Sequence, residues 1–506
     1  MPLDFGLPCN TSGRSIKRLA SLYRAVCAER NGRLRAPCPP FGGGADGAGH
    51  ALSPVQGSAC FGTLRRARDG LWAFQGGQAG AGAGGDCGGG AYLLHRKRLA
   101  PALPASRGRC LPGTIHRQET MDETLSHDLV EQARQWRLDL HRHPEMAFQE
   151  RRTGDFVARM LAEWGLEVRR GHGRTGVVGT LVRGSSSRSL ALRADMDALP
   201  MEEHTNLPWR STIPNRFHGC GHDGHTTILL GTARYLAQTR NFDGTAVFIF
   251  QPAEEGLGGA RAMIADGLFE KFPLDEVYGL HNAPDLDAGQ VAVVTGPAMA
   301  GADFFDITVT GFGSHGAMPE QSRDPVVIAM TLGQALQTIV SRNVPPMQAA
   351  VLSITQIHAG AAYNVIPGEA KLAGTVRAFS DKVRKQVRER MRTIAAGIAT
   401  AFGVDIKVEI RDIFTVLENH PEHADAVAGV AREVVGAGNV DTNPEPKMGS
   451  EDFADMLRAV PGAYFWLGHD GTVPLHNPGF ILDDKILPVG ASLFSRIIET
   501  RLPLQA

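Results

Sequence analysis

Beyond the first quarter of the chain, apolar positions follow either helical spacing or short continuous runs. Apolar residues three or four positions apart over 125–145, ended by Pro144, predict a helix. Val- and Leu-rich runs at 176–182 and 189–194 predict buried strands, and a helix is expected at about 223–239. Further strands are expected at 244–250, 277–282, 290–294 and 463–467, and further helices at 151–164, 421–436, 450–459 and 486–500. Strands alternating with helices indicate an α/β domain with a largely parallel sheet.

A second pattern interrupts this domain over residues 302–413. Its elements run strand, helix, strand, strand, helix, strand, which is the order of a ferredoxin-like fold. The strands are expected at 304–310, 349–357, 369–378 and 404–411, and the helices at 325–341 and 381–402. We therefore expect a catalytic domain built from 121–301 and 414–506, with the insert as a lid. Clefts between two such units commonly hold a site.

Residues 1–120 have a different composition. They hold 16 Lys and Arg against 6 Asp and Glu, six of the seven cysteines, and the glycine-rich stretch 71–90. No helical or strand period persists, so we expect this segment to be disordered or absent from the mature protein. An organellar transit segment is one interpretation. We favour the other, in which the segment lies upstream of a natural start at Met121.

Bulk properties narrow the class of protein. The net charge of −1 gives no reason to expect nucleic acid as a partner, and no apolar run reaches the roughly 18 residues of a membrane helix. Cys220 is the only cysteine after residue 120, so the folded part cannot form an internal disulfide. This fits a reducing compartment, and we expect a cytoplasmic protein.

The segment FHGCGHDGHT, residues 217–226, is the densest cluster of chemical groups. It brings Cys220, His222, Asp223 and His225 to the start of a predicted helix, and thiolate, imidazole and carboxylate are the ligands of zinc-like metals. A polar helix cap with chance histidines is the alternative. Because glycines separate the polar residues, we favour a metal site.

Paired glutamates end the next apolar strand, in FIFQPAEEG. Glu254 and Glu255 follow Pro252, and adjacent residues on an extended chain point in different directions. One carboxylate can then bind a metal while the other holds a water, although for the pair taken alone a solvated acidic loop is the favoured interpretation.

Several other polar residues follow predicted strands or lie in loops. His281 ends a strand in GLHNAP, and His476 lies in PLHNPGF between prolines; each is a ligand or a structural histidine. Asp195 and Asp197 follow another strand, as ligands or as carboxylates that orient a ligand histidine.

The lid carries three further candidates. His315 lies in the glycine-rich loop GFGSHGAMPE, Asn364 in YNVIPG and Arg377 in GTVRAF. An arginine can grip a substrate carboxylate with two parallel hydrogen bonds. A turn residue, a capped amide and a surface charge are the respective alternatives.

In order along residues 141–480, these segments resemble one family closely. It comprises hippurate hydrolases, bacterial N-acyl-amino-acid amidohydrolases and plant auxin-conjugate hydrolases, in the aminoacylase-type branch of the co-catalytic metallopeptidases. Residues 1–120 have no counterpart in it. The matching motifs are HRHPE, RADMDALP, CGHDGHT, FQPAEEG, GLHN, SHGAMPE, NVIPG, GTVRAF, GSEDFA and LHNPGF.

The resemblance implies a fold and a division of roles. The fold is a zinc-peptidase-like α/β body with an inserted lid that forms a homodimer or higher homo-oligomer. Two divalent metal ions (Zn, Mn, Ni or Co) are implied, with Glu254 as general base and His315 reaching the active site of a dimer partner to stabilise the oxyanion. The implied ligands are Cys220, His222, Glu255, His281 and His476. Gly219 replaces the alanine that relatives often have before the cysteine, which puts nothing in doubt because both are small.

The function expected is hydrolysis of the amide bond of N-acyl amino acids, with Arg377 or Asn364 holding the free carboxylate of the substrate. A dipeptidase or carboxypeptidase of the same family is an alternative. A non-catalytic homologue that binds acyl-amino acids is a second, against which the intact Glu254 and ligand set argue.

Overall fold

The computed structural model describes residues 62–66, 72–76 and 125–505, in two units, 1–109 and 110–506. In the first unit, β1 (Gly62–Arg66) and β2 (Trp72–Gly76) form an antiparallel pair, a departure from the expectation of no regular structure there. The rest of residues 1–124 lies outside the described residues. The expectations about disorder and about a start at Met121 therefore stay predictions.

An eight-stranded sheet forms the centre of the second unit, in the order β17-β8-β18-β7-β5-β6-β4-β3. The strands are β3 (Glu167–His172), β4 (Gly176–Arg183), β5 (Ser189–Asp195), β6 (Gly244–Gln251), β7 (Glu276–Ala283), β8 (Val291–Ala292), β17 (Val440–Asp441) and β18 (Gly462–Gly468). The four central strands, β18, β7, β5 and β6, are parallel. Antiparallel pairs flank them, so the sheet is mixed where a largely parallel one was predicted.

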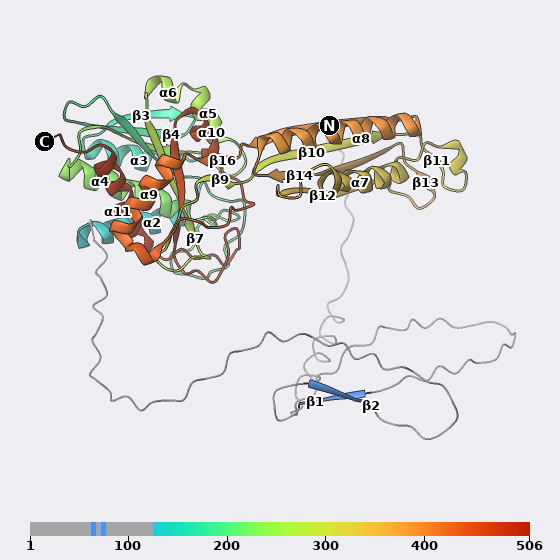
Figure 1. Ribbon diagram of the computed structural model, residues 1–506, viewed down its shortest axis with the longest axis horizontal. Helices are drawn as coiled ribbons and strands as arrows, with labels where there is room; N and C mark the ends of the chain where they lie inside the picture. Colours follow the sequence, from blue (N-terminus) through green and yellow to red (C-terminus); the bar gives the residue numbers. More distant parts are fainter. Residues whose placement is uncertain (1–61, 67–71, 77–124, 506) are drawn as a thin grey trace, which may run out of the picture. The chain divides into compact units, whose positions relative to one another are not determined.

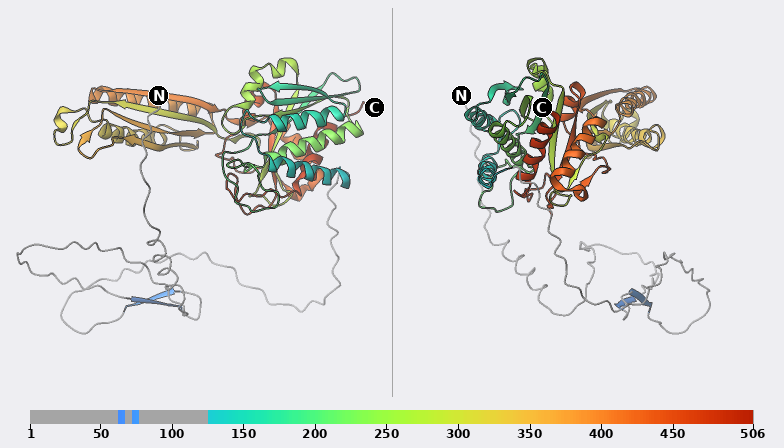
Figure 2. Two further views of the ribbon diagram at one scale, coloured as in Figure 1. Left: turned by 180° about the vertical axis from the view of Figure 1, so that it is seen from behind. Right: turned by 60° about the vertical axis from the view of Figure 1, so that its left-hand side comes forward.

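Helices cover both faces of this sheet (Figures 1 and 2). One face packs against α2 (His127–Arg142), α3 (Arg151–Glu163), α4 (His222–Thr239), α9 (Pro421–Val435) and α11 (Ile486–Arg501). The other packs against α5 (Gly259–Ala265), α6 (Leu268–Lys271) and α10 (Phe453–Ala459). Within β5, Leu190 and Leu192 enter the first layer and Ala191 the second, as the two-residue period of a strand requires.

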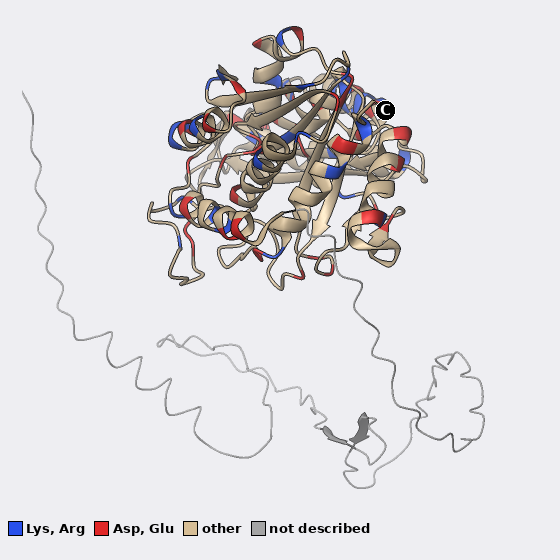
Figure 3. Ribbon diagram, turned by 90° about the vertical axis from the view of Figure 1, so that its left-hand side faces the viewer, with Lys and Arg blue, Asp and Glu red and all other residues tan. Residues whose placement is uncertain are grey.

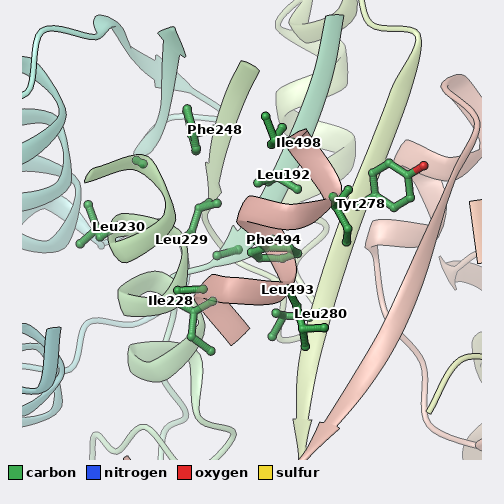
Figure 4. Close-up of a cluster of buried hydrophobic side chains, with 14 of the residues drawn as sticks. Leu192, Ile228, Leu229, Leu230, Phe248, Tyr278, Leu280, Leu493, Phe494 and Ile498 are labelled. Atoms are coloured by element: carbon green, nitrogen blue, oxygen red, sulfur yellow. The ribbon is translucent and has the colours of Figure 1, made fainter. Parts of the chain in front are cut away.

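Figure 4 shows the larger core, where α4 and α11 meet the sheet. Leu229, Phe248, Phe494 and Ile498 are fully buried there. Burying side chains of this size stabilises the fold by about 1.5–3 kcal/mol each. The core fixes the sheet, and with it the loops that leave its carboxyl edge.

The predicted lid, residues 302–413, has a sheet of its own. Its elements are β10 (Gly301–Thr310), α7 (Pro325–Arg342), β12 (Ala350–Ala359), β14 (Glu369–Ala378), α8 (Asp381–Phe402) and β15 (Asp405–Phe414). The antiparallel order β12-β14-β10-β15 and the element order are those expected of a ferredoxin-like fold. Buried and less buried residues alternate along β14, because one sheet face packs on α7 and α8.

Two short antiparallel pairs complete the second unit: β9 (Gly296–Met299) pairs with β16 (Leu417–Asn419) outside the lid, and β11 (Ser314–His315) pairs with β13 (Val365–Ile366) within it. Single 3-10 turns lie at Pro319–Gln321 and Ala437–Asn439.

Basic and acidic residues are interspersed along the outer helices (Figure 3). Within the described ranges, every helix is too short or too polar to cross a bilayer.

Candidate active site

The candidate residues converge at the carboxyl edge of the parallel strands. Asp195 ends β5, Glu254 follows β6 by three positions, and His281 lies near the end of β7. Helix α4 begins at His222, directly after Cys220 and Gly221. Gly221 has φ of 89°, and a Cβ there would lie 2.4 Å from the Asn282 amide nitrogen, so only glycine fits this close approach.

Five metal-type donors lie within one cluster: Cys220, His222, Glu255, His281 and His476. The Cys220 Sγ is 3.4 Å from His281 Nε2 and 3.3 Å from His476 Nε2. The Glu255 Oε1 lies 3.2 Å from His476 Nε2 and 4.0 Å from His222 Nε2. The structure therefore brings together all five residues that the motifs singled out as ligands.

Backbone carbonyls orient two of the imidazoles. His222 Nδ1 donates to the carbonyl of Asp197 at 2.9 Å, and His281 Nδ1 donates to the carbonyl of Asn282 at 2.6 Å. In each ring the Nε2 lone pair is left to face the cluster, which is how proteins prepare a histidine to bind a metal. Burial also lowers the pKa of His281 well below its ordinary value, which favours the neutral ligand form.

Two donor atoms of the cluster are buried and incompletely satisfied. Among the residues that the structure describes, His222 Nε2 has no hydrogen-bond partner, and Glu255 Oε1 makes no hydrogen bond beyond its 3.2 Å ion-pair contact with His476 Nε2. Leaving such an atom unpaired costs about 1–3 kcal/mol, and a cation between the two would satisfy both. Thiolate, imidazole and carboxylate donors are also the right chemistry for a zinc-like ion. The residues present therefore fit a divalent metal.

Glu254 lies between the donor cluster and a second acidic group. Its carboxylate is within 4.8 Å of ligand atoms of His222 and Glu255 on one side and of Glu451 and Asp452 on the other, and the residue is only 7% exposed. Burial raises the pKa of Glu254 well above its ordinary value, and the charges of Glu451 and Glu255 raise it further. A carboxylate with a raised pKa holds a proton more readily, as a general base requires.

Asp197 accepts hydrogen bonds from backbone amides, and Asp195 accepts one from a histidine. Asp197 accepts hydrogen bonds from the backbone N–H groups of Glu254 and Glu255 at 3.1 and 3.0 Å. Asp195 pairs with His225 Nδ1 at 2.7 Å, and the Nε2 of that ring accepts from the backbone N–H of Asn282. Both ring nitrogens of His225 are thus occupied, and the ring holds the end of β7.

A buried network of ion pairs beneath the site was not predicted from the sequence. Arg193, 0% exposed, donates to Asp195 at 2.8 Å, to Glu451 at 2.9 Å and to Asp452 at 3.2 Å. Its Nε also donates to Gln251 at 2.8 Å. Arg193 and Glu451 stand inside the motifs RADMDALP and GSEDFA, which was the one available signal.

A cavity of about 700 Å³ opens over the cluster. Glu254 and the donors other than His222 line it together with apolar residues that include Trp466, and the lid contributes Phe304 and Arg377. Arg377 donates to Ser450 Oγ at 2.5 Å, and its guanidinium lies 5.9 Å from the centre of the Phe304 ring. The cavity therefore combines hydrolytic groups with a cation that can meet a substrate carboxylate.

The structure does not bring His315 and Asn364 to this cavity. Arg377 pairs with Ala302 near the start of β10, whereas His315 follows Thr310 at the other end of that strand. Eight residues of strand separate those ends by roughly 25 Å. His315 and Asn364 are exposed and lie beside each other, since Gly316 N donates to Asn364 O at 2.7 Å.

Comparisons with known proteins identify the class. Residues 191–500 match Peptidase family M20/M25/M40. The chain is 44% identical to a hippurate hydrolase of Campylobacter jejuni over 73% of its own length and 96% of that protein. It is 37% identical to thermostable carboxypeptidase 1 of Saccharolobus solfataricus, over 73% of the chain and 96% of the relative.

A solved structure has the same architecture. The Bacillus subtilis YXEP protein, described as a dinuclear metal binding peptidase from the M20 family, is 35% identical with a TM-score of 0.66. The match covers 74% of this chain and 99% of that one.

These matches define the chain as an amidohydrolase of the metallopeptidase type. It belongs to Peptidase family M20/M25/M40. The resemblance to hippurate hydrolases and the expected α/β fold are confirmed.

The Arg193 network predicts a large loss of stability on its removal. Arg193→Met leaves three buried carboxylates without their cation, and the free energy of unfolding is expected to fall by about 3–5 kcal/mol. Urea denaturation measures this. Arg169→Met, at a site 65% exposed and paired with Glu167, should change stability by less than about 0.5 kcal/mol. Equal effects of the two substitutions would contradict a special role for the buried ion network.

Proposed function

We propose that this protein hydrolyses N-acyl amino acids of the hippurate type to a carboxylic acid and a free amino acid. One observation carries the proposal: the buried carboxylate of Glu254 and the guanidinium of Arg377 face one cavity with the metal-type donors. The 44% identity to a hippurate hydrolase supports the same substrate class.

The donor cluster is proposed to hold two divalent ions, through Cys220, His222, Glu255, His281 and His476. The Bacillus subtilis neighbour described as dinuclear supports the number. Zinc suits the thiolate of Cys220, and manganese, nickel and cobalt are compatible with the same donors. Bound divalent ions supply positive charge that acidifies water and stabilises negative charge on a carbonyl oxygen.

The protein's own groups then perform the proton transfers. Glu254 takes a proton at its carboxylate as water adds to the amide carbon. It returns that proton to the amide nitrogen as the carbon–nitrogen bond breaks, which releases the amino acid with a neutral amine. The raised pKa of Glu254 suits both halves of this exchange.

Arg377 is proposed to hold the carboxylate of the amino acid product and of its precursor, with Asn364 as the alternative. Only Arg377 lines the cavity of the same chain, which favours it. His315 is proposed to stabilise the oxyanion from a second subunit, since it is exposed and distant from the cavity of its own chain.

This role for His315 requires a homodimer or higher homo-oligomer through the lid. Phe312, Met318, Tyr363 and Val365, all near His315, are large exposed apolar residues, which supports such a contact. The single described cysteine, Cys220, fits a reducing compartment, and we keep the expectation of a cytoplasmic enzyme.

The paired glutamates provide the first test. Wild-type protein loaded with zinc or manganese is expected to release benzoate from hippurate. Glu254→Gln should retain the metal and lose about a thousandfold or more in kcat, because an amide cannot accept the proton. Glu255→Gln should instead lower the metal content, measured by atomic emission.

The opposite pattern in the two variants would reverse the assignment of base and ligand. Cleavage of peptides with a free carboxyl terminus, without cleavage of N-acetyl or N-benzoyl amino acids, would establish the carboxypeptidase alternative that the Saccharolobus relative represents.

The grip on the substrate carboxylate provides the second test. Arg377→Ala should weaken binding of hippurate by about 1.5–3 kcal/mol, the usual value of a charged hydrogen bond, seen as a raised KM. The amide of hippurate has no carboxylate and should lose little. Arg411→Ala, an exposed lid arginine paired with Asp306, is the matched control. An equal loss for hippurate and its amide would exclude this role for Arg377.

Action of His315 across a dimer provides the third test. Glu254→Gln and His315→Ala proteins are each expected to have little activity, because each dimer lacks one essential group at both sites. A random mixture should recover about a quarter of the wild-type rate, since half of the dimers hold one intact site. Mixed dimers verified by native mass spectrometry that stay inactive would rule out action in trans.

A further inference from the structure

Glu150 is a fully buried carboxylate to which the proposed chemistry gives no role. It precedes α3, is 0% exposed, and does not cap that helix with its side chain. Its Oε1 accepts from the backbone N–H of Phe148 at 3.0 Å and of Ala253 at 2.9 Å. Its Oε2 accepts from the Thr175 hydroxyl at 2.6 Å. A buried carboxyl is costly, so these three bonds point to a specific task.

The contact with Ala253 reaches the turn that carries the paired glutamates. Ala253 has φ of 55°, the left-handed region, and it is fully buried. This conformation costs a residue with a Cβ roughly 1–2 kcal/mol and persists only where the surroundings impose it. Helix α5 closes over the same turn, since a Cβ on Gly259 would lie 1.6 Å from the Pro252 carbonyl oxygen.

Two buried carboxylates together hold three consecutive backbone amides. Asp197 takes the N–H groups of Glu254 and Glu255, one on each oxygen. Glu150 takes the N–H of Ala253, one residue earlier. The anchors come from different segments, the start of α3 and the loop after β5, so the turn is fixed from two sides. The directions of the Glu254 and Glu255 side chains follow from that backbone.

We propose that Glu150 is a positioning residue, which holds Ala253 in the left-handed turn and thereby aims Glu254 at the cavity. The consequence for turnover rests on the proposed function, in which Glu254 is the base. The turn needs from Glu150 an acceptor oxygen within hydrogen-bond distance of the Ala253 N–H, and a negative charge is not required. Burial raises the pKa of Glu150 to about 7, so the neutral form is readily accessible near neutral pH.

Two variants of Glu150 separate the effect of side-chain length from the effect of charge, and a variant of Thr175 serves as the control. Glu150→Gln keeps an acceptor oxygen at the same distance, and its amide can donate to Thr175, so kcat should stay within about threefold of wild type. Glu150→Asp keeps the charge but is one methylene too short, and kcat should fall by about 100-fold with KM changed less than about threefold. Thr175→Val removes the bond on the other oxygen, and it should leave turnover near wild type.

Hydrogen exchange measures the stability of the turn at Ala253 without any substrate. In the metal-loaded protein, the amide of Ala253, followed by mass spectrometry in a peptide spanning 248–256, should exchange faster in Glu150→Asp than in wild type. It should stay protected in Glu150→Gln and Thr175→Val. If wild type cleaves no N-acyl amino acid, the proposed function fails, while this measurement still decides whether Glu150 holds the turn.

Two results overturn the proposal. One is a Glu150→Asp protein with wild-type turnover and a protected Ala253 amide. The other is a folded Glu150→Gln protein that loses turnover about tenfold or more, because its acceptor oxygen is still in place. The second result also decides the matter if the aspartate variant does not fold.

Discussion

A single buried guanidinium ties together the chain segments that form the site. Arg193 lies on β5 and reaches Asp195 on the same strand, Gln251 at the end of β6, and Glu451 and Asp452 before α10. A buried charge is tolerated only with partners at hydrogen-bond distance, so these four groups must stay where they are. Asp195 in turn holds His225, and His225 holds Asn282 near the end of β7, next to His281. The position of Arg193 therefore affects the position of the donor cluster.

Most helices and strands could be predicted because the spacing of their apolar residues shows which face is buried. The predicted helices at 325–341 and 381–402 differ from the observed ones by at most one residue at an end. Strand β3 was missed, since EVRRGH is a polar edge strand whose pairing with β4 depends on the neighbour and not on its own pattern. Strand direction is likewise absent from periodicity, which explains why the antiparallel flanks of the sheet were not foreseen.

The metal-type donors were identifiable because their residue types are rare in such density and because their motifs resemble a family. The residues that support these donors could not be identified from the sequence. Glu150, Arg193 and Glu451 are charged residues, and charged residues usually lie at the surface. Only the fold shows that these three are buried and that each one anchors the backbone or the carboxylates under the site. His315 shows the opposite case. Its motif identifies it as a candidate site residue, but it lies far from the cavity of its own chain.

The concentration of carboxylates explains why the site needs so much internal support. Asp195, Asp197, Glu254, Glu255 and Glu451 come from the ends of β5 and β6 and from the segment before α10, and Arg193 contacts only two of these five. Like charges this close repel one another, and this repulsion adds to the effect of burial in raising the pKa of Glu254. Backbone N–H groups offset part of that repulsion, as at Asp197, and two bound divalent cations would offset much of the rest. A rigid acidic frame of this kind favours bound cations, and burial together with the charges of Glu451 and Glu255 keeps the pKa of Glu254 above its ordinary value.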